Sequence, residues 1–337
     1  MLEKGRAVPP FLFIRNSFVI SCCRTMKVNQ QIDSLVKRPG RYLGENTMKG
    51  IFVACALLSI ITTAGIVLVL LFDAAEFFRN ISIFQFLTGT RWSPTIKPTE
   101  FGVLPLISGT LTFTFCTALI ALPVGLLAAI YLSEYAGDKI RSIIKPALEV
   151  LAGIPTVVYG YFALVYITPL LRRIFPGIST FNVLSASIVV AIMIIPTVAS
   201  ISEDAMRAVP NSLRLAGYGL GVTKFQVSTT IVLPAAFSGI VSSFILGISR
   251  AIGETMAVTI AGGNLSRIVN PLKPSEAFLE PIQTMTAAMV EIGTSDVTGD
   301  SVAYKSLFAI GLTLFLLTLV LNIISQFIKS RYREKYE

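Results

Sequence analysis

The chain has 337 residues, of which 53% are apolar and 14% are charged, and its mean hydropathy is +0.74. Because a soluble globular domain carries roughly 25% charged residues, this composition excludes an ordinary soluble protein and indicates a chain embedded in a lipid bilayer. The formal charge of +9 comes without a single histidine, which excludes Ser–His or Cys–His catalytic pairs and metal sites built on imidazole.

The first 48 residues form a basic segment that precedes the long apolar runs. Its apolar patch, residues 11–23, is interrupted by Arg15, and no small-residue cleavage site follows. These features argue against a secretory signal peptide and favour a cytoplasmic N-terminal arm. Met26 and Met48 offer alternative starts of translation.

Six uncharged stretches are long enough to cross a bilayer, which takes about 18 or more residues. They are residues 51–72, 101–133, 150–171, 174–202, 225–249 and 306–328. Glycine and proline at the start of the second stretch predict that its helix begins near Thr110, and the turn at Pro176 predicts that the fourth helix begins near Val183. A further apolar run continues beyond Glu254. The sequence therefore predicts an all-α membrane protein with six transmembrane helices and both termini on one side.

The distribution of Lys and Arg around these spans predicts which side that is. The segments on the side of the termini carry 19 Lys and Arg, and the opposite segments carry eight, so both termini are expected in the cytoplasm. The longest opposite loop, residues 264–303, contains three prolines and is expected to hold a short helix of its own. The chain thus divides into an arm (1–48), a first helix with an external segment (49–102), a core (103–330) and a cytoplasmic tail (331–337).

The usual signatures of catalysis and of bound cofactors are missing from the sequence. It has no phosphate-binding loop, no dinucleotide glycine fingerprint and no cluster of carboxylates typical of a metal site. The four cysteines fit neither a disulfide framework nor a zinc site; they are Cys22, Cys23, Cys55 and Cys116. We expect a chain without catalysis, metal or cofactor of its own, so a partner must hydrolyse any nucleotide that drives it.

A glycine-rich cytoplasmic segment, residues 205–234, carries a family resemblance. From Leu215 onward it resembles the EAA loop of ABC importer permeases, with Ala216, Gly221 and the closing Ile-x-Leu-Pro at matching positions. Leu215 replaces the usual Glu, and Gly217 replaces the usual Ala. In that family the loop is a short helix, turned at the glycine, that docks on an ATPase. The resemblance assigns ATPase docking to Leu215, Ala216, Gly217, Gly221, Thr223 and Phe225.

A second segment, residues 249–259, narrows the family. Its sequence Ser-Arg-Ala-Ile-Gly-Glu-Thr-Met-Ala-Val-Thr resembles the R-A-x-G-E-T-M-A-V stretch of phosphate importer permeases, and its Met-Ala-Val ending is closer to the PstC type than to the PstA type. Residues 152–160 and 203–210 resemble the same family. The resemblance covers residues 49 to 330 and implies the type I permease fold of ABC transporters, in the bacterial inner membrane.

The resemblance also implies an assembly and a mechanism. This subunit would pair with a homologous PstA-type permease, and two ATPase subunits that bind ATP and Mg would lie beneath the pair. An extracytoplasmic phosphate-binding protein would dock above it. Closure of the ATPase subunits would draw the docking helices together and rearrange the spans, so the implied function is ATP-driven phosphate import through this chain.

Two charges inside an apolar stretch also indicate a polar path without reference to any family. Arg250 and Glu254 lie one helical turn apart, and charges at membrane depth cost a few kcal/mol each unless they face a polar cavity. With the adjacent Thr255 they are the candidate substrate path. The same i,i+4 spacing also allows a structural ion pair, in which the two charges neutralise each other.

Other functions remain open from the sequence alone. The substrate could be another oxyanion, such as sulfate or molybdate. A secondary transporter or channel would need no ATPase, and uptake without the ATPase would identify it. A membrane-embedded enzyme is a weaker alternative because the spans contain no catalytic pair.

Overall fold

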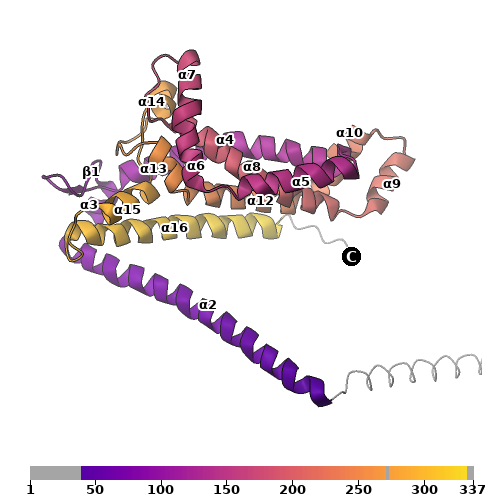
Figure 1. Ribbon diagram of the computed structural model, residues 1–337, viewed down its shortest axis with the longest axis horizontal. Coiled ribbons are helices and arrows are strands. Elements are labelled where there is room, and N and C mark those ends of the chain that lie inside the picture. Colours follow the sequence, from indigo (N-terminus) through magenta and orange to yellow (C-terminus); the bar gives the residue numbers. More distant parts are fainter. Residues whose placement is uncertain (1–38, 271–272, 332–337) are drawn as a thin grey trace, which may run out of the picture. The chain divides into compact units, whose positions relative to one another are not determined.

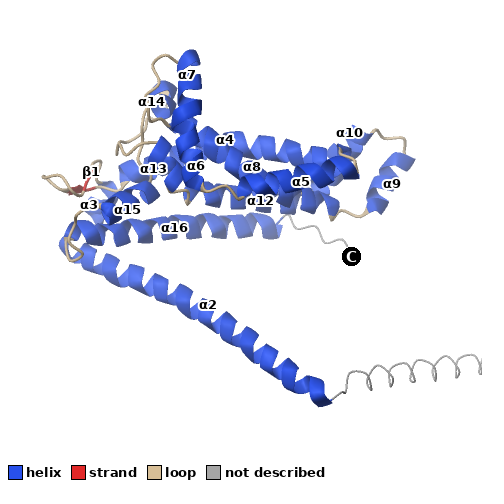
Figure 2. Cartoon of the chain, in the orientation of Figure 1, coloured by secondary structure: helices blue, strands red, loops and turns tan. Residues whose placement is uncertain are grey.

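The computed structural model describes residues 39–270 and 273–331. This part is helical almost throughout, with one short pair of strands (Figures 1 and 2). The expectations for the N-terminal arm up to residue 38, including Cys22, Cys23 and Met26, and for the tail beyond residue 331 fall outside the described residues. The chain forms two compact units, residues 1–68 and 69–337, and every site discussed below lies in the second.

The helices follow one another along the chain as α2 (Pro39–Asn80), α3 (Ile83–Thr88), α4 (Leu104–Ile130), α5 (Asp138–Ala152), α6 (Thr156–Phe162), α7 (Thr168–Ile174), α8 (Val183–Arg207), α9 (Asn211–Gly219), α10 (Lys224–Val227), α11 (Leu233–Ala235), α12 (Phe237–Ile252), α13 (Met256–Ala261), α14 (Pro274–Leu279), α15 (Met285–Thr294) and α16 (Val302–Arg331). Short π-helical segments continue α4, α6 and α10, namely η1 (Tyr131–Tyr135), η2 (Ala163–Ile167) and η3 (Ser228–Val232). The strands β1 (Trp92–Ser93) and β2 (Glu100–Phe101) pair antiparallel, with Trp92 opposite Phe101.

Five helices in the described part are long and apolar enough to cross a membrane, and a bent pair makes a sixth candidate span. The five are Thr47–Asn80, Leu104–Tyr135, Thr156–Ile174, Val183–Arg207 and Val302–Phe327. The bent pair joins Lys224–Ala235 to Phe237–Ile252 through a bend of 72°. The prediction of an all-helical membrane protein is confirmed, with six spans when the bent pair counts as one.

Two of the expected span boundaries were wrong. The second helix begins at Leu104 rather than near Thr110, because a proline in the first turn of a helix costs no hydrogen bond. The stretch 150–171 is not one element, since its first residues end the amphipathic α5 and the span begins only at Thr156, after the break at Gly153–Pro155. The fifth stretch is bent at Ala236, a feature that the sequence did not predict.

The core of the second unit lies where α8 packs against α4 and α12. Two glycines permit this close approach. A Cβ atom added to Gly125 in α4 would lie 2.8 Å from Val198 Cγ1, and one added to Gly247 in α12 would lie 3.0 Å from Val198 Cγ2. α8 contains more buried residues than any other described helix, and its C-terminal end carries the acidic residues Glu203 and Asp204.

Another apolar cluster lies at one end of the second unit, the end at which α3, β1, α14 and α15 are found. The helices α9 and α10 lie at the opposite end of this unit (Figure 1). The rings of Phe86 and Phe101 meet Phe77 edge-on at centroid distances of 5.6 and 5.5 Å. The Ser266 hydroxyl donates to the Trp92 carbonyl at 2.9 Å. The stretch 264–303, which was expected to hold one helix, contains two, α14 and α15.

Reporter fusions test the predicted sidedness of these two ends. Fusions after Gly89, Pro176 and Ser275 are expected to report the external side, and a fusion after Gly219 the cytoplasm, because Lys and Arg are retained on the cytoplasmic side. Alkaline phosphatase and a fluorescent protein provide the paired readouts. A cytoplasmic signal from the Pro176 fusion would contradict this topology.

Candidate functional site

The glycine-rich segment forms a tight turn between α9 and α10, and Gly221 is required at that turn. The amide of Gly221 donates to the Tyr218 carbonyl at 3.0 Å, and the amide of Val222 donates to the Gly217 carbonyl at 3.3 Å. This pair of bonds is a Schellman motif, which satisfies the last carbonyl groups of α9 and needs a left-handed residue after the helix. Gly221 supplies it with φ of +76°, so α9 stops there.

The chain restarts as a helix directly after this turn. The Thr223 hydroxyl accepts from the Gln226 amide at 3.4 Å, and the Gln226 side chain accepts from the Thr223 amide at 3.0 Å. This capping box fixes the first turn of α10. Two short helices therefore flank the glycine, where the sequence predicted one helix turned at it.

Five of the six predicted docking residues are exposed around this turn, and Gly217 is not. Leu215 and Phe225 are 68% and 67% exposed. Gly217 is buried, and a Cβ atom there would lie 2.8 Å from Ile231 Cδ1 and 3.0 Å from Val227 Cγ2. Gly217 therefore allows α9 to pack closely against the segment formed by α10 and η3. Leu220, 83% exposed, adds an apolar residue to this surface that the motif comparison did not single out.

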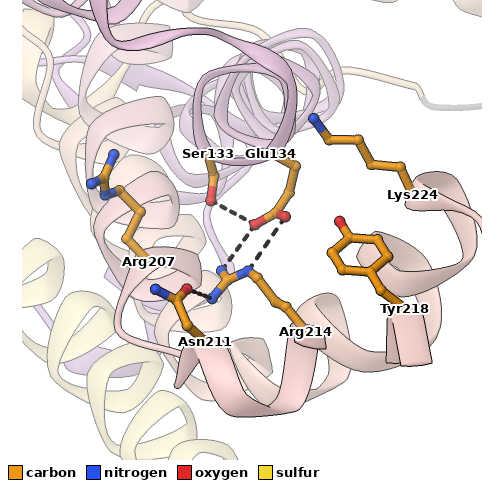
Figure 3. Close-up of a pocket in the computed structure, with 7 residues that line it drawn as sticks. All are labelled: Ser133, Glu134, Arg207, Asn211, Arg214, Tyr218 and Lys224. Carbon is orange, nitrogen blue, oxygen red and sulfur yellow. Dashed lines mark hydrogen bonds and ion pairs between the residues drawn. The ribbon is translucent and has the colours of Figure 1, made fainter. Parts of the chain in front are cut away.

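A buried ion pair anchors α9 to the end of the α4 span. Arg214 Nη2 donates to Glu134 Oε1 at 3.0 Å, and Ser133 donates to the same carboxylate at 2.9 Å (Figure 3). The side chains of Arg214 and Glu134 are only 14% and 4% exposed. Since the two residues lie 80 positions apart in the sequence, no local pattern could have predicted their contact.

Arg214 also binds the end of α8. Its guanidinium donates to the carbonyl oxygens of Val209 at 2.6 Å and Met206 at 2.8 Å, and to the Asn211 side chain at 3.3 Å. One side chain thus joins α9 to two spans. Displacement of α9 must either carry these spans with it or break several charge-assisted bonds.

A second ionic cluster joins α5 to the end of α8. Glu203, whose side chain is 1% exposed, contacts Arg141 at 2.6 Å and Lys145 at 2.9 Å. Lys145 also reaches Asp204 at 2.8 Å, and this hydrogen bond raises the pKa of the Lys145 ammonium above its ordinary value. Lys145 therefore stays charged throughout the physiological range.

The predicted path residues lie at a break between α12 and α13. α12 ends at Ile252, so Arg250 and Glu254 do not share one helix. Arg250 donates to the Thr197 hydroxyl of α8 at 3.1 Å, while the buried Glu254 accepts the Ala257 amide at 3.1 Å. Within the described chain no ion pair joins the two charges, and the alternative of a structural i,i+4 pair is wrong.

Polar contacts surround this break. The Thr255 hydroxyl donates to the Gly253 carbonyl at 3.2 Å, and the Thr286 hydroxyl of α15 donates to the Glu254 carbonyl at 2.8 Å. The cationic Arg250 and the acidic Glu254 thus each have a separate hydrogen-bond partner within the described residues. In residues 39–270 and 273–331 no three metal-ligating side chains are grouped closely enough to hold a metal ion.

The chain is similar to known membrane permeases along most of its length. Residues 121–334 match the family model of the "Binding-protein-dependent transport system inner membrane component". The chain is 33% identical to the "Probable ABC transporter permease protein YqgH" of Bacillus subtilis (91% of this chain, 97% of that protein). It is 33% identical to the "Phosphate transport system permease protein PstC" of Mesorhizobium japonicum (82% and 88%) and 32% identical to that of Pasteurella multocida (85% and 89%).

Solved structures show the same fold at low sequence identity. A bacterial alginate ABC transporter with its periplasmic protein matches with a TM-score of 0.59 at 14% identity, covering 83% of this chain and 94% of that one. The inward-facing MetNI methionine ABC transporter matches with a TM-score of 0.51 at 17% identity, covering 69% and 95%. These matches identify the type I permease fold.

Proposed function

Because this chain belongs to the family of binding-protein-dependent transport system inner membrane components, we propose that it forms the phosphate path of an ATP-driven importer. It is a multi-pass inner-membrane permease subunit and is not itself catalytic. The observation that carries the choice of phosphate is its similarity, over more than four fifths of its length, to permeases named for phosphate transport.

The proposed assembly follows from this membership. A homologous PstA-type permease completes the path, two ATPase subunits bind ATP and Mg, and an extracytoplasmic phosphate-binding protein delivers the anion. The proposed ATPase contact is the exposed surface of Leu215, Ala216, Leu220, Thr223 and Phe225 around the turn at Gly221. Leu215 replaces the acidic residue that the family motif has at this position. The proposed contact there is therefore apolar instead of charged.

Gly221→Ala is expected to uncouple ATP hydrolysis from uptake. An L-residue in the left-handed conformation costs about 1–2 kcal/mol, so α9 would no longer end in its native turn. Gly219→Ala is the matched control, because Gly219 lies within α9, has ordinary φ and has open space around its Cα. Phosphate uptake and ATP hydrolysis are measured together in proteoliposomes. Equal coupling in the two variants would contradict a role for the turn.

A Cys at Thr223 tests the docking surface directly. We expect it to cross-link to the ATPase, because Thr223 is exposed beside Gly221. A Cys at Ser142, exposed on α5, is the control position. Cross-linking at Ser142 without cross-linking at Thr223 would place the contact elsewhere.

Arg250, Glu254 and Thr255 are the proposed path residues. An arginine offers several N–H donors to an oxyanion, and an ionised carboxylate only accepts. Phosphate near neutral pH both accepts and donates through its O–H group, whereas sulfate only accepts. The partially exposed Arg250 and the nearly buried Glu254 therefore suit phosphate better than sulfate.

Uptake of radiolabelled phosphate by the reconstituted complex tests the proposal. We expect ATP-dependent uptake with this subunit present and none without it, and weaker uptake of sulfate offered at the same concentration through a binding protein that delivers both anions. Preferred uptake of sulfate or molybdate would identify a permease for another oxyanion. Uptake that persists without the ATPase subunits would identify a secondary transporter.

A further inference from the structure

A polar pocket lies between the end of the α4 span and the α9–α10 turn. Its volume is about 320 Å³, and every side chain in its lining carries a polar or charged group. The lining consists of Ser133, Glu134, Arg207, Asn211, Arg214, Tyr218 and Lys224 (Figure 3). Three cations and one carboxylate give the lining a formal charge of +2.

Glu134, the one carboxylate in the lining, is already paired with Arg214. The positive charges of Arg207 and Lys224 therefore have no carboxylate in the pocket to neutralise them. Both oxygens of Glu134 face Arg214, at 3.0 and 3.5 Å. Lys224 stacks over the Tyr135 ring at 5.1 Å, and no carboxylate of the described residues lies within ion-pair distance of it. Arg207 is 3.9 Å from Glu203, which already has Arg141 and Lys145 at shorter distances.

The remaining groups are suited to a tetrahedral oxyanion. The Tyr218 hydroxyl and the Asn211 amide add donors to the two cations, whereas the Ser133 hydroxyl already donates to Glu134. In Figure 3 the Tyr218 hydroxyl and the Arg214 guanidinium border the same open space. A phosphate group has three or four acceptor oxygens and a charge of about −1 to −2, which matches this donor set. An apolar ligand would leave these donors unpaired.

We propose that this pocket binds a phosphate group at the cytoplasmic end of the protein, and that Arg207 and Lys224 supply the positive charge that attracts it. The site is separate from the proposed transport path at Arg250. The group belongs either to free phosphate or to the headgroup of an anionic lipid, since η1 continues a membrane span and the pocket lies at its end. A ligand here contacts α8, α9 and α10 together, and so stabilises one position of the α9–α10 turn.

Binding of labelled phosphate to the purified complex in neutral detergent, without ATP, tests this proposal. The Arg207→Gln/Lys224→Gln variant is expected to bind phosphate at the pocket about tenfold more weakly than the parent. The Lys49→Gln/Lys139→Gln variant removes equal charge from exposed positions outside the pocket and is expected to bind like the parent. All three carry Arg250→Ala, which removes the proposed path site from the measurement.

Native mass spectrometry of the same complexes, purified from membranes with phosphatidylglycerol, provides the lipid arm. Pocket-dependent retention of phosphatidylglycerol identifies the headgroup as the source, and pocket-dependent binding of labelled phosphate identifies the free anion. Equal binding by the pocket variant and its control in both arms would overturn the proposal. Neither readout requires transport, so failure of the phosphate uptake experiment would leave this result standing.

Discussion

Arg214→Ala is expected to abolish ATP-driven uptake while the ATPase subunits continue to hydrolyse ATP. The substitution leaves Glu134 buried without its cation and frees the carbonyl groups of Met206 and Val209. Breaking a buried ion pair by removing one partner costs about 3–5 kcal/mol. Because α9 loses its attachment to the ends of α4 and α8, movement of the ATPase would no longer reach the spans.

Two further variants separate lost coupling from lost folding. Arg214→Lys keeps the charge but not the fork of N–H donors, so it is expected to restore uptake in part. Glu134→Gln keeps the shape and an acceptor oxygen and is expected to weaken coupling less than Arg214→Ala. Uptake per membrane-inserted subunit, measured with ATP hydrolysis in proteoliposomes, is the readout. Full uptake by Arg214→Ala would show that the pair only stabilises the fold.

Arg250→Ala is expected to reduce phosphate uptake about 100-fold, the effect of losing roughly 3 kcal/mol of charge-assisted binding. Within the described residues Arg250 has no ion-pair partner and donates a hydrogen bond to the neutral Thr197 hydroxyl, so its charge is available to an anion. The initial rate of uptake at saturating binding protein is the measurement. Arg250→Lys is expected to recover part of the rate.

Thr197→Val is the control for a structural role of that contact. It removes the hydroxyl bonded to Arg250 but keeps the charge, so uptake is expected to change much less than in Arg250→Ala. Glu254→Gln retains an acceptor for the Ala257 amide and is expected to weaken phosphate uptake while reducing the rejection of sulfate. Wild-type uptake in both Arg250→Ala and Glu254→Gln would place the path elsewhere.

The membrane spans could be predicted because their signal is local. A run of uncharged residues has few alternatives to a helix in lipid, and the fourth helix begins at Val183 as expected. The errors arose where apolar sequence continues across a break in structure. Val150 is apolar yet belongs to the amphipathic α5, and the bend at Ala236 has no charge to mark it.

In the candidate sites, the sequence could predict only the features that depend on residues close together in the chain. The turn at Gly221 follows from a motif, because its hydrogen bonds join residues within six positions. The partners of Arg214 and Arg250 depend on which helices meet, and the contacts with Glu134 and Thr197 cross 80 and 53 positions. The alternative of an ion pair between Arg250 and Glu254 assumed that one helix continued past Ile252, where α12 ends.

The 72° bend between α11 and α12 would set the direction in which the proposed ATPase contact transmits force to the span. A straight span pushed sideways at one end simply tilts as a rod. Here the segment Lys224–Ala235, which contains α10 and α11, lies at a steep angle to the axis of α12. It would therefore act as a lever arm on α12. In the proposed assembly, a sliding motion of the ATPase parallel to the membrane plane would therefore become a torque on α12, whose far end carries Arg250.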